Sequence, residues 1–194
     1  MMRHTIITFT QQETRDLVKS WLLISLAFGI LLSGGLSLSP GFFMVFVASL
    51  LTVGLGFVAH ELAHKVSALR LGCTAAFRAN NVMLFLAVLM SFFGFIIAAP
   101  GAVRIQGHLS KKQRGLIALM GPLANVVLAV VFLPLLFAVP FVGMIGVRIN
   151  AFLAAFNLLP IRGFDGVQAM QWNTAGYVLL LVASIGLIMA SYLL

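Results

Sequence analysis

The sequence predicts an all-α polytopic membrane protein, on the evidence of its composition and of the way its apolar residues are distributed. Of its 194 residues, 62% are hydrophobic and 8% are charged, whereas a soluble domain carries about a quarter of its residues as charge. The apolar residues form uncharged runs of about 20 residues, long enough to cross a hydrocarbon layer of about 30 Å. One cysteine excludes a disulfide scaffold. The net charge of +8 reflects a scarcity of acids, which argues against nucleic-acid binding.

The first apolar run follows a polar N-terminal segment that has none of the marks of a cleavable signal. We therefore expect a retained first helix at 21–38. The charged residues before it, Glu13 and Asp16, are interpreted as part of a solvated helix start. The second apolar run predicts a helix at 41–71.

The apolar stretch that begins at residue 115 is too long for one crossing. Pro134, Pro140 and Gly143 interrupt it, and these residue types end helices. The stretch is therefore divided into two helices, and one more follows near the end of the chain. The three predicted helices are 115–137, 143–160 and 174–194. With no repeat and no appended soluble segment, residues 1–194 are expected to form a single membrane-embedded domain.

Two of the four histidines flank one of the four acids in the run His60-Glu61-Leu62-Ala63-His64. Residues four apart lie about 40° apart around a helix, so the two histidines point from one face, as two ligands of one metal must. Glu61 lies about 100° further round, where it can take the proton of a zinc-activated water. A merely interfacial polar helix end is the alternative, but ionisable groups are costly in a membrane. The run predicts one Zn²⁺, with Glu61 as general base.

A catalytic zinc needs a third protein ligand and an open position. Asp165 is the remaining acid outside the N-terminal segment, and Pro160, Gly163 and Gly166 interrupt the helix around it. Broken backbone at membrane depth is tolerated where it lines a cavity. We therefore predict Asp165 as the third ligand, the alternative being an interfacial ion pair with Arg162.

Asp165 can reach the same zinc only if the chain crosses the membrane an even number of times between His64 and Asp165. Basic residues mark the cytoplasmic side of a membrane protein, and they flank the apolar run Val82–Ala99 of segment 80–107 on both sides. We therefore expect this segment to enter the membrane and return, ending in a strand-like stretch at Pro100–Gly107. On this count the N-terminus is cytoplasmic, and Arg148 falls near the external start of the next helix. The flanking basic residues are Lys65, Arg70, Arg78, Arg104, Lys111, Lys112 and Arg114.

The run at 60–64, followed about a hundred residues later by Asn157-Leu158-Leu159-Pro160 and Asp165-Gly166, resembles the site-2 protease family of intramembrane zinc proteases. Gly121-Pro122-Leu123-Ala124-Asn125 is similar to that family's GPxxN element. The chain looks like a short archaeal-type member without a PDZ or CBS domain. It departs from the family at Arg162 and Gly163, where many members carry prolines or apolar residues.

The resemblance implies a re-entrant β segment near 80–107 and assigns roles to individual residues. Asn125 and Asn157 are implied to hold a substrate strand or a loop near the metal. For Asn125 the alternative is a buried amide bonded to a backbone carbonyl, and Gly121 is interpreted as a residue that permits close helix packing. The implied zinc ligands are His60, His64 and Asp165, and the implied base is Glu61.

These observations predict an intramembrane zinc endopeptidase of the cell membrane. Its expected partners are a transmembrane protein substrate and the lipid bilayer, with no nucleic acid. A membrane metal-binding or transport protein, or a proteolytically inactive homologue, is the alternative. A transporter needs further ligands along a path, and four acids, four histidines and one cysteine are too few to build a second site.

Overall fold

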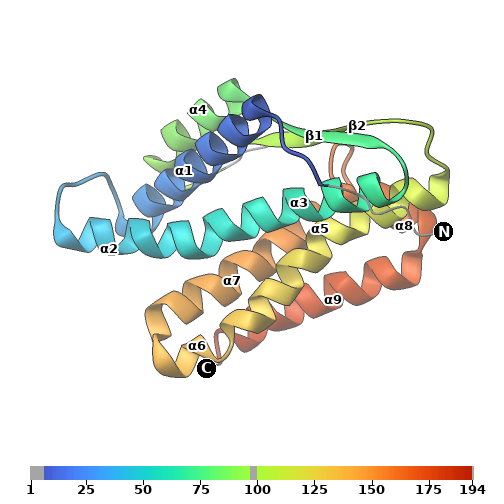
Figure 1. Ribbon diagram of the computed structural model, residues 1–194. Coiled ribbons are helices and arrows are strands. Elements are labelled where there is room, and N and C mark those ends of the chain that lie inside the picture. Colours follow the sequence, from blue (N-terminus) through green and yellow to red (C-terminus); the bar gives the residue numbers. More distant parts are fainter. Residues whose placement is uncertain (1–6, 97–99, 194) are drawn as a thin grey trace.

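The computed structural model describes residues 7–96 and 100–193, so the last residues of the apolar part of segment 80–107 lie outside the described residues. Within them the protein is predominantly helical, with one two-stranded sheet (Figure 1). Five helical segments are long and apolar enough to span a membrane, which confirms the predicted fold class. These are Gln11–Ser33, Pro40–Arg70, Lys111–Ala138, Pro140–Asn157 and Thr174–Leu193.

The first helix, α1 (Gln11–Ser33), begins ten residues earlier than predicted. Thr10 is its N-cap, and the Thr10 hydroxyl accepts a hydrogen bond from the amide of Glu13 at 3.1 Å. The interpretation of Glu13 as solvated was wrong, since its exposed fraction is 1%. The hydropathy argument left residues 11–20 out of the helix because they carry charges, and it could not show that Glu13 is paired with Lys65.

Glu13 forms a buried ion pair with Lys65, the residue that follows the second histidine of the 60–64 run. The Lys65 ammonium lies 2.7 Å from both carboxylate oxygens of Glu13 and also donates to the carbonyl of Thr8. The same carboxylate accepts from the backbone amide of Phe77 at 3.0 Å. One side chain of α1 thus fixes both the helix that carries the histidines and the strand beside it.

Replacing Glu13 with alanine is expected to lower the free energy of unfolding by about 3–5 kcal/mol, because it leaves the Lys65 ammonium buried without its counter-ion. Denaturant titration in detergent micelles, followed by circular dichroism, measures this. Lys19→Ala is the control. Its ion pair with Asp16 is partly exposed, so the loss should be about 0–1 kcal/mol. Equal losses for the two variants would contradict a structural role for the buried pair.

The second spanning segment is one continuous helix made of α2 (Pro40–Ser49), a π-helical turn η1 (Leu50–Gly54) and α3 (Leu55–Arg70). At the π-helical turn the indole of Trp21 donates to the carbonyl of Leu50 at 3.0 Å. Gly54 makes room for this ring, because a Cβ at Gly54 would lie 2.3 Å from it. The α1 helix is thereby seated against the helix that leads into α3.

The part of the chain between α3 and the next long helix contains a hairpin and one short helix, and its expected entry into a membrane and return stays a prediction. Strands β1 (Thr74–Ala79) and β2 (Gly101–Gln106) pair antiparallel, and α4 (Asn81–Ser91) leaves and rejoins the hairpin at one end. The amide of Asn80 donates to the carbonyl of Pro100 at 2.9 Å, which joins the residue before α4 to the residue before β2. At 11 residues, α4 is about 16 Å long and too short to cross a bilayer.

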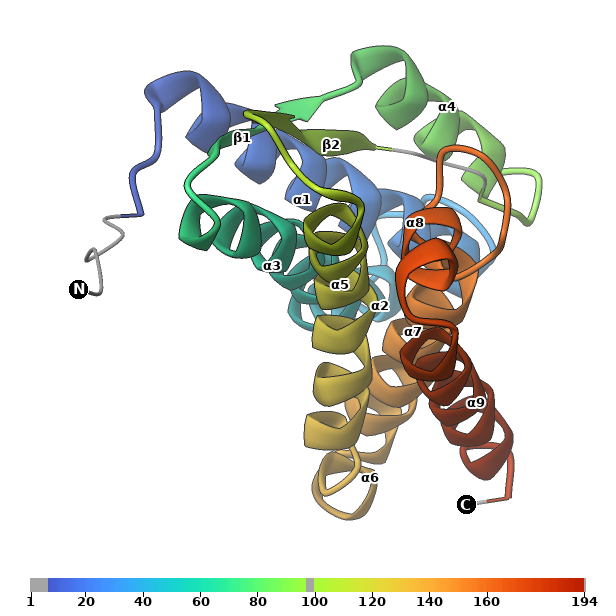
Figure 2. The same ribbon diagram turned by 90° about the vertical axis from the view of Figure 1, so that its right-hand side faces the viewer.

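The remaining helices form a bundle below the hairpin (Figure 2). Helix α5 (Lys111–Phe132) packs against α3, α7 and α8, and α6 (Leu135–Ala138) turns the chain into α7 (Pro140–Asn157). Pro134 and Pro140 lie at these boundaries, as predicted, and α5 and α7 run in opposite directions. Two segments long enough to span a membrane, which run in opposite directions, therefore separate α3 from α8 (Asp165–Trp172), and α9 (Thr174–Ala190) follows.

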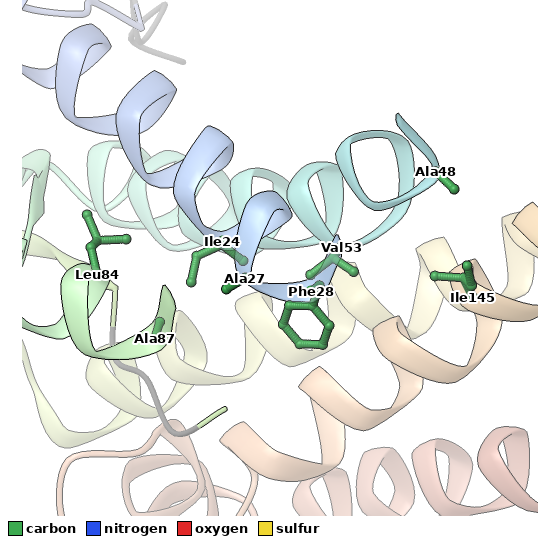
Figure 3. Packing of buried hydrophobic residues seen from close by; sticks show 8 residues of the cluster. All are labelled: Ile24, Ala27, Phe28, Ala48, Val53, Leu84, Ala87 and Ile145. Carbon is green, nitrogen blue, oxygen red and sulfur yellow. The ribbon is translucent and has the colours of Figure 1, made fainter. Parts of the chain in front are cut away.

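A cluster of buried apolar side chains joins α1 to α2, η1, α4 and α7 (Figure 3). In this view Phe28 of α1 lies beside Val53 of the π-helical turn, and Ile145 of α7 belongs to the same cluster. Helix α4 contributes Leu84 and Ala87 to the same cluster. Helices α4 and α7 thus pack against α1 in the same cluster.

Arg148 lies within α7, as it does in the predicted helix 143–160, and its expected place at the external end of that helix stays a prediction. Its guanidinium donates to the hydroxyl and the carbonyl of Ser191, at 3.2 and 2.9 Å, and lies 4.1 Å from the centre of the Tyr192 ring. A charge in a spanning helix is therefore paired with the C-terminal end of α9, where helix carbonyls are otherwise unpaired.

Candidate metal centre

The side chains of His60, His64 and Asp165 meet at one point between α3 and α8. The Nε2 atoms of the two histidines lie 3.0 Å apart, and each lies within 3.3 Å of Oδ2 of Asp165. These three residues offer one ligand atom each to a common centre. Both histidines are buried. Asp165 thus lies on the same side of the bundle as the two histidines, and it pairs with them rather than with Arg162.

The backbone around Asp165 explains why a residue a hundred positions away reaches α3. Asp165 is the first residue of α8, and the turn before it contains Gly163 with φ of 104°, a conformation that favours glycine. Gly166 approaches the end of α7 so closely that a Cβ would lie 2.2 Å from the carbonyl oxygen of Leu158. The two glycines allow the chain to leave α7, turn and present the carboxylate to the histidines.

Each histidine is oriented by a hydrogen bond on the ring nitrogen that faces away from Asp165. His64 Nδ1 donates to the backbone carbonyl of Ile117 at 2.8 Å, and His60 Nδ1 donates to Oδ1 of Asn125 at 2.7 Å. Both partners are on α5. A proton on Nδ1 leaves the lone pair of Nε2 free, which is the arrangement that metal-binding histidines use.

The absence of a side chain at Gly121 makes space for the centre. A Cβ at Gly121 would lie 2.3 Å from His64 Nε2 and 2.7 Å from His60 Cε1. The sequence interpretation of Gly121 as a helix-packing residue was incomplete, because the close approach is to the two imidazoles.

The donor set fits a divalent transition metal. Two imidazoles and one carboxylate leave one position of a tetrahedral site open, as in catalytic zinc centres. Ligands about 2.0–2.1 Å from a tetrahedral zinc lie about 3.3 Å from one another, and the three separations here are 3.0, 3.2 and 3.3 Å. The side chain of an aspartate is ionised at neutral pH, so Asp165 is able to act as a ligand.

Glu61 lies next to this cluster in a cavity of about 550 Å³. Its carboxyl is buried and faces the backbone of Val103 in β2. The cavity is lined on one side by β2 and on another by the end of α7 and the turn before α8. Glu61, the three candidate metal ligands and strand β2 thus line the same cavity.

The other two predicted site residues differ in their positions. Asn125 is fully buried, and its hydrogen bond to His60 orients that candidate metal ligand. Asn125 also donates to the backbone carbonyl of Gly56, which matches the alternative interpretation of a buried amide bonded to a carbonyl. Asn157 lines the cavity and donates to the carbonyl of Leu153 in its own helix. The Ile117 carbonyl was missed, since a backbone group leaves no trace in the sequence.

Comparisons with known proteins give two relatives. A protein of Methanocaldococcus jannaschii named "Putative zinc metalloprotease" is 40% identical over 178 residues, which cover 87% of this chain and 88% of the relative. A protein of Mycolicibacterium smegmatis with the same description is 32% identical over 137 residues, which cover 58% of this chain and 51% of the relative. No family model matches the chain, and no solved structure matches it.

Proposed function

The chain belongs to the site-2 protease family of zinc metalloproteases, and from this premise we propose that it is an intramembrane endopeptidase that hydrolyses peptide bonds in or near transmembrane segments of its substrates. The observation that carries the proposal is the meeting of His60, His64 and Asp165 beside Glu61, inside a bundle of apolar helices.

One zinc ion is proposed to be held by His60, His64 and Asp165. Bound there, zinc supplies Lewis-acid polarisation of the peptide carbonyl and makes water more acidic. The protein supplies the rest of the chemistry. Glu61 takes a proton from water in the cavity and passes it to the leaving amine. The Nδ1 hydrogen bonds of the two histidines keep both rings in one orientation throughout.

The substrate is proposed to bind in an extended form along β2. An intact helix hides its carbonyls in hydrogen bonds, so a peptide bond can be attacked only after local unwinding. Strand β2 pairs with β1 on one side, and residues Gly101–Val103 line the cavity that holds Glu61. A peptide added to the other edge of β2 would pass through this cavity, its backbone held by main-chain hydrogen bonds.

Removing the metal is expected to abolish cleavage reversibly. The experiment uses the full chain in liposomes with a single-span substrate that carries a fluorescent label, and compares samples with and without a zinc chelator. Cleavage should stop with the chelator and return when zinc is added. Metal analysis of the purified protein should give one zinc per chain. Cleavage that continues in the presence of the chelator would contradict the proposed zinc enzyme. Zinc binding without any cleavage would also contradict it and would favour a metal-binding or transport role.

The active-site end of the bundle is proposed to face the cytoplasm, because the basic residues of β1, β2 and the start of α5 gather there. The short helix α6 lies at the other end of the bundle (Figure 1). Cys73 is the one cysteine of the chain, so single-cysteine variants can be made in a Cys73→Ser background. In intact cells, a membrane-impermeant maleimide should label Phe137→Cys and spare Lys112→Cys. The reverse pattern would invert the proposed orientation.

A further inference from the structure

We propose that Asn150 of α7 is a positioning residue of the metal centre, acting on His60 through Asn125. The proposal rests on the metal centre proposed above. It concerns three fully or almost fully buried side chains from three helices. Asn150 and Asn125 have exposed fractions of 0%, and His60 has 6%. No contact joins Asn150 to the ligand atoms, so its influence must be transmitted by hydrogen bonds.

The first step is the orientation of the Asn150 amide. Its Nδ2 donates to the carbonyl of Gly146, one turn earlier in α7, at 2.9 Å. A backbone carbonyl accepts hydrogen bonds and donates none, so the nitrogen of the amide must face Gly146. The oxygen Oδ1 is consequently turned away from α7 and toward α5.

The second step carries this orientation to Asn125. Nδ2 of Asn125 donates to Oδ1 of Asn150 at 3.1 Å and to the carbonyl of Gly56 at 3.0 Å. Both hydrogens of this amide are therefore used, and both partners are oriented acceptors. Oδ1 of Asn125 is left facing His60, where it can only accept.

The third step reaches the metal ligand. Because Oδ1 of Asn125 accepts from His60 Nδ1 at 2.7 Å, the ring proton is held on Nδ1 and Nε2 remains available as a ligand. If Asn125 rotated by 180°, its amide hydrogens would face Nδ1, and His60 would need its proton on Nε2, the ligand atom. Asn150 and Gly56 are the two restraints against that rotation.

The glycine at position 56 belongs to the same arrangement. A Cβ at Gly56 would lie 2.2 Å from Oδ1 of Asn150 and 3.3 Å from Nδ2 of Asn125. Helix α3 thus leaves space at this position for the amide oxygen from α7. A Gly56→Ala variant disturbs the chain of hydrogen bonds without deleting any of its polar groups.

The test is the zinc affinity of the purified full chain in detergent, measured by competition with a coloured chelator. Removing a hydrogen-bond partner of a ligand typically weakens metal binding about 10–100-fold. We expect Asn125→Leu to fall within this range, and Asn150→Leu and Gly56→Ala to weaken binding about tenfold, near its lower end. Asn150→Ala, which adds no bulk, should behave like Asn150→Leu.

A double-variant comparison separates positioning from general packing. If Asn150 acts through Asn125, then Asn150→Leu has no further effect on zinc affinity in the Asn125→Leu background. Val147→Ala is the control, because Val147 is fully buried in the same helix. It should lower the unfolding temperature and leave zinc affinity unchanged. The visible spectrum of the cobalt(II) form should change in Asn150→Leu and match the native protein in Val147→Ala.

Two results would overturn the proposal. One is a native zinc affinity in the Asn150 variants, and the other is a double variant whose loss is the product of the two single losses. A native chain that binds no zinc would instead overturn the metal centre itself, and the role of Asn150 with it.

Discussion

A Glu61→Gln variant is expected to retain its zinc and to lose about 10³-fold in cleavage rate, within the usual range for removal of a general acid–base group. Glutamine has nearly the size of glutamate and fills the same part of the cavity beside Val103, but its amide cannot take a proton from water. Because the metal-binding atoms come from His60, His64 and Asp165, the substitution should leave zinc content unchanged. Cleavage of the labelled substrate and metal analysis are measured on the same preparation.

Asp16→Asn is the matched control for this change of a carboxylate to an amide. Asp16 lies on α1, where it pairs with Lys19 and accepts from the amide of Ala79. It is not among the residues that line the cavity, so cleavage should stay close to the native rate. Cleavage retained in Glu61→Gln would contradict the role of Glu61 as the base. Loss of zinc in that variant would show instead that Glu61 helps to hold the metal.

The second large effect is expected from the smallest substitution available at the centre. Gly121→Ala adds one methyl group at a point 2.3 Å from His64 Nε2, the atom proposed to bind zinc. Helix α5 is packed against α3 and cannot withdraw easily, so the imidazoles must turn away from Asp165. Zinc affinity should fall by about 100-fold or more, at or beyond the upper end for disturbed ligand orientation, and cleavage should fall with it.

Gly186→Ala makes the same substitution in α9, where a Cβ would have no other atom within 4 Å. Alanine is favoured over glycine inside a helix by about 1 kcal/mol, so this control should bind zinc normally and be no less stable. Both variants are compared by zinc competition and by thermal unfolding. Native zinc affinity in Gly121→Ala would mean that the two histidines do not converge at the position described here.

The general architecture could be predicted from the sequence because it depends on local properties. The length of each apolar run sets the number of spanning helices, and prolines at 134 and 140 divide one run into two. The requirement that Asp165 share a side with the histidines, together with the basic residues around segment 80–107, predicted a re-entrant segment. The strand-like end expected for that segment is observed as β2, whereas its course in a membrane stays a prediction.

The start of α1 was predicted wrongly for a physical reason. A hydropathy argument treats every charge as solvated, but Glu13 is neutralised by Lys65, 52 positions away in the chain. Arg148 likewise has its partner far along the chain, at the end of α9. Pairing between distant residues makes a charge acceptable in an apolar bundle, and the order of residues alone does not record it.

The amino-acid sequence by itself determined that His60 and His64 share a helix face, because their spacing and the pitch of the helix are local properties. It also singled out Asp165, because so few acids are present in the chain. The tertiary structure alone decided what holds these groups in place. The Ile117 carbonyl, the space above Gly121 and the hydrogen bonds from Asn150 through Asn125 come from α5 and α7. These contacts exist only once the helices have packed, since each joins residues that are far apart along the chain.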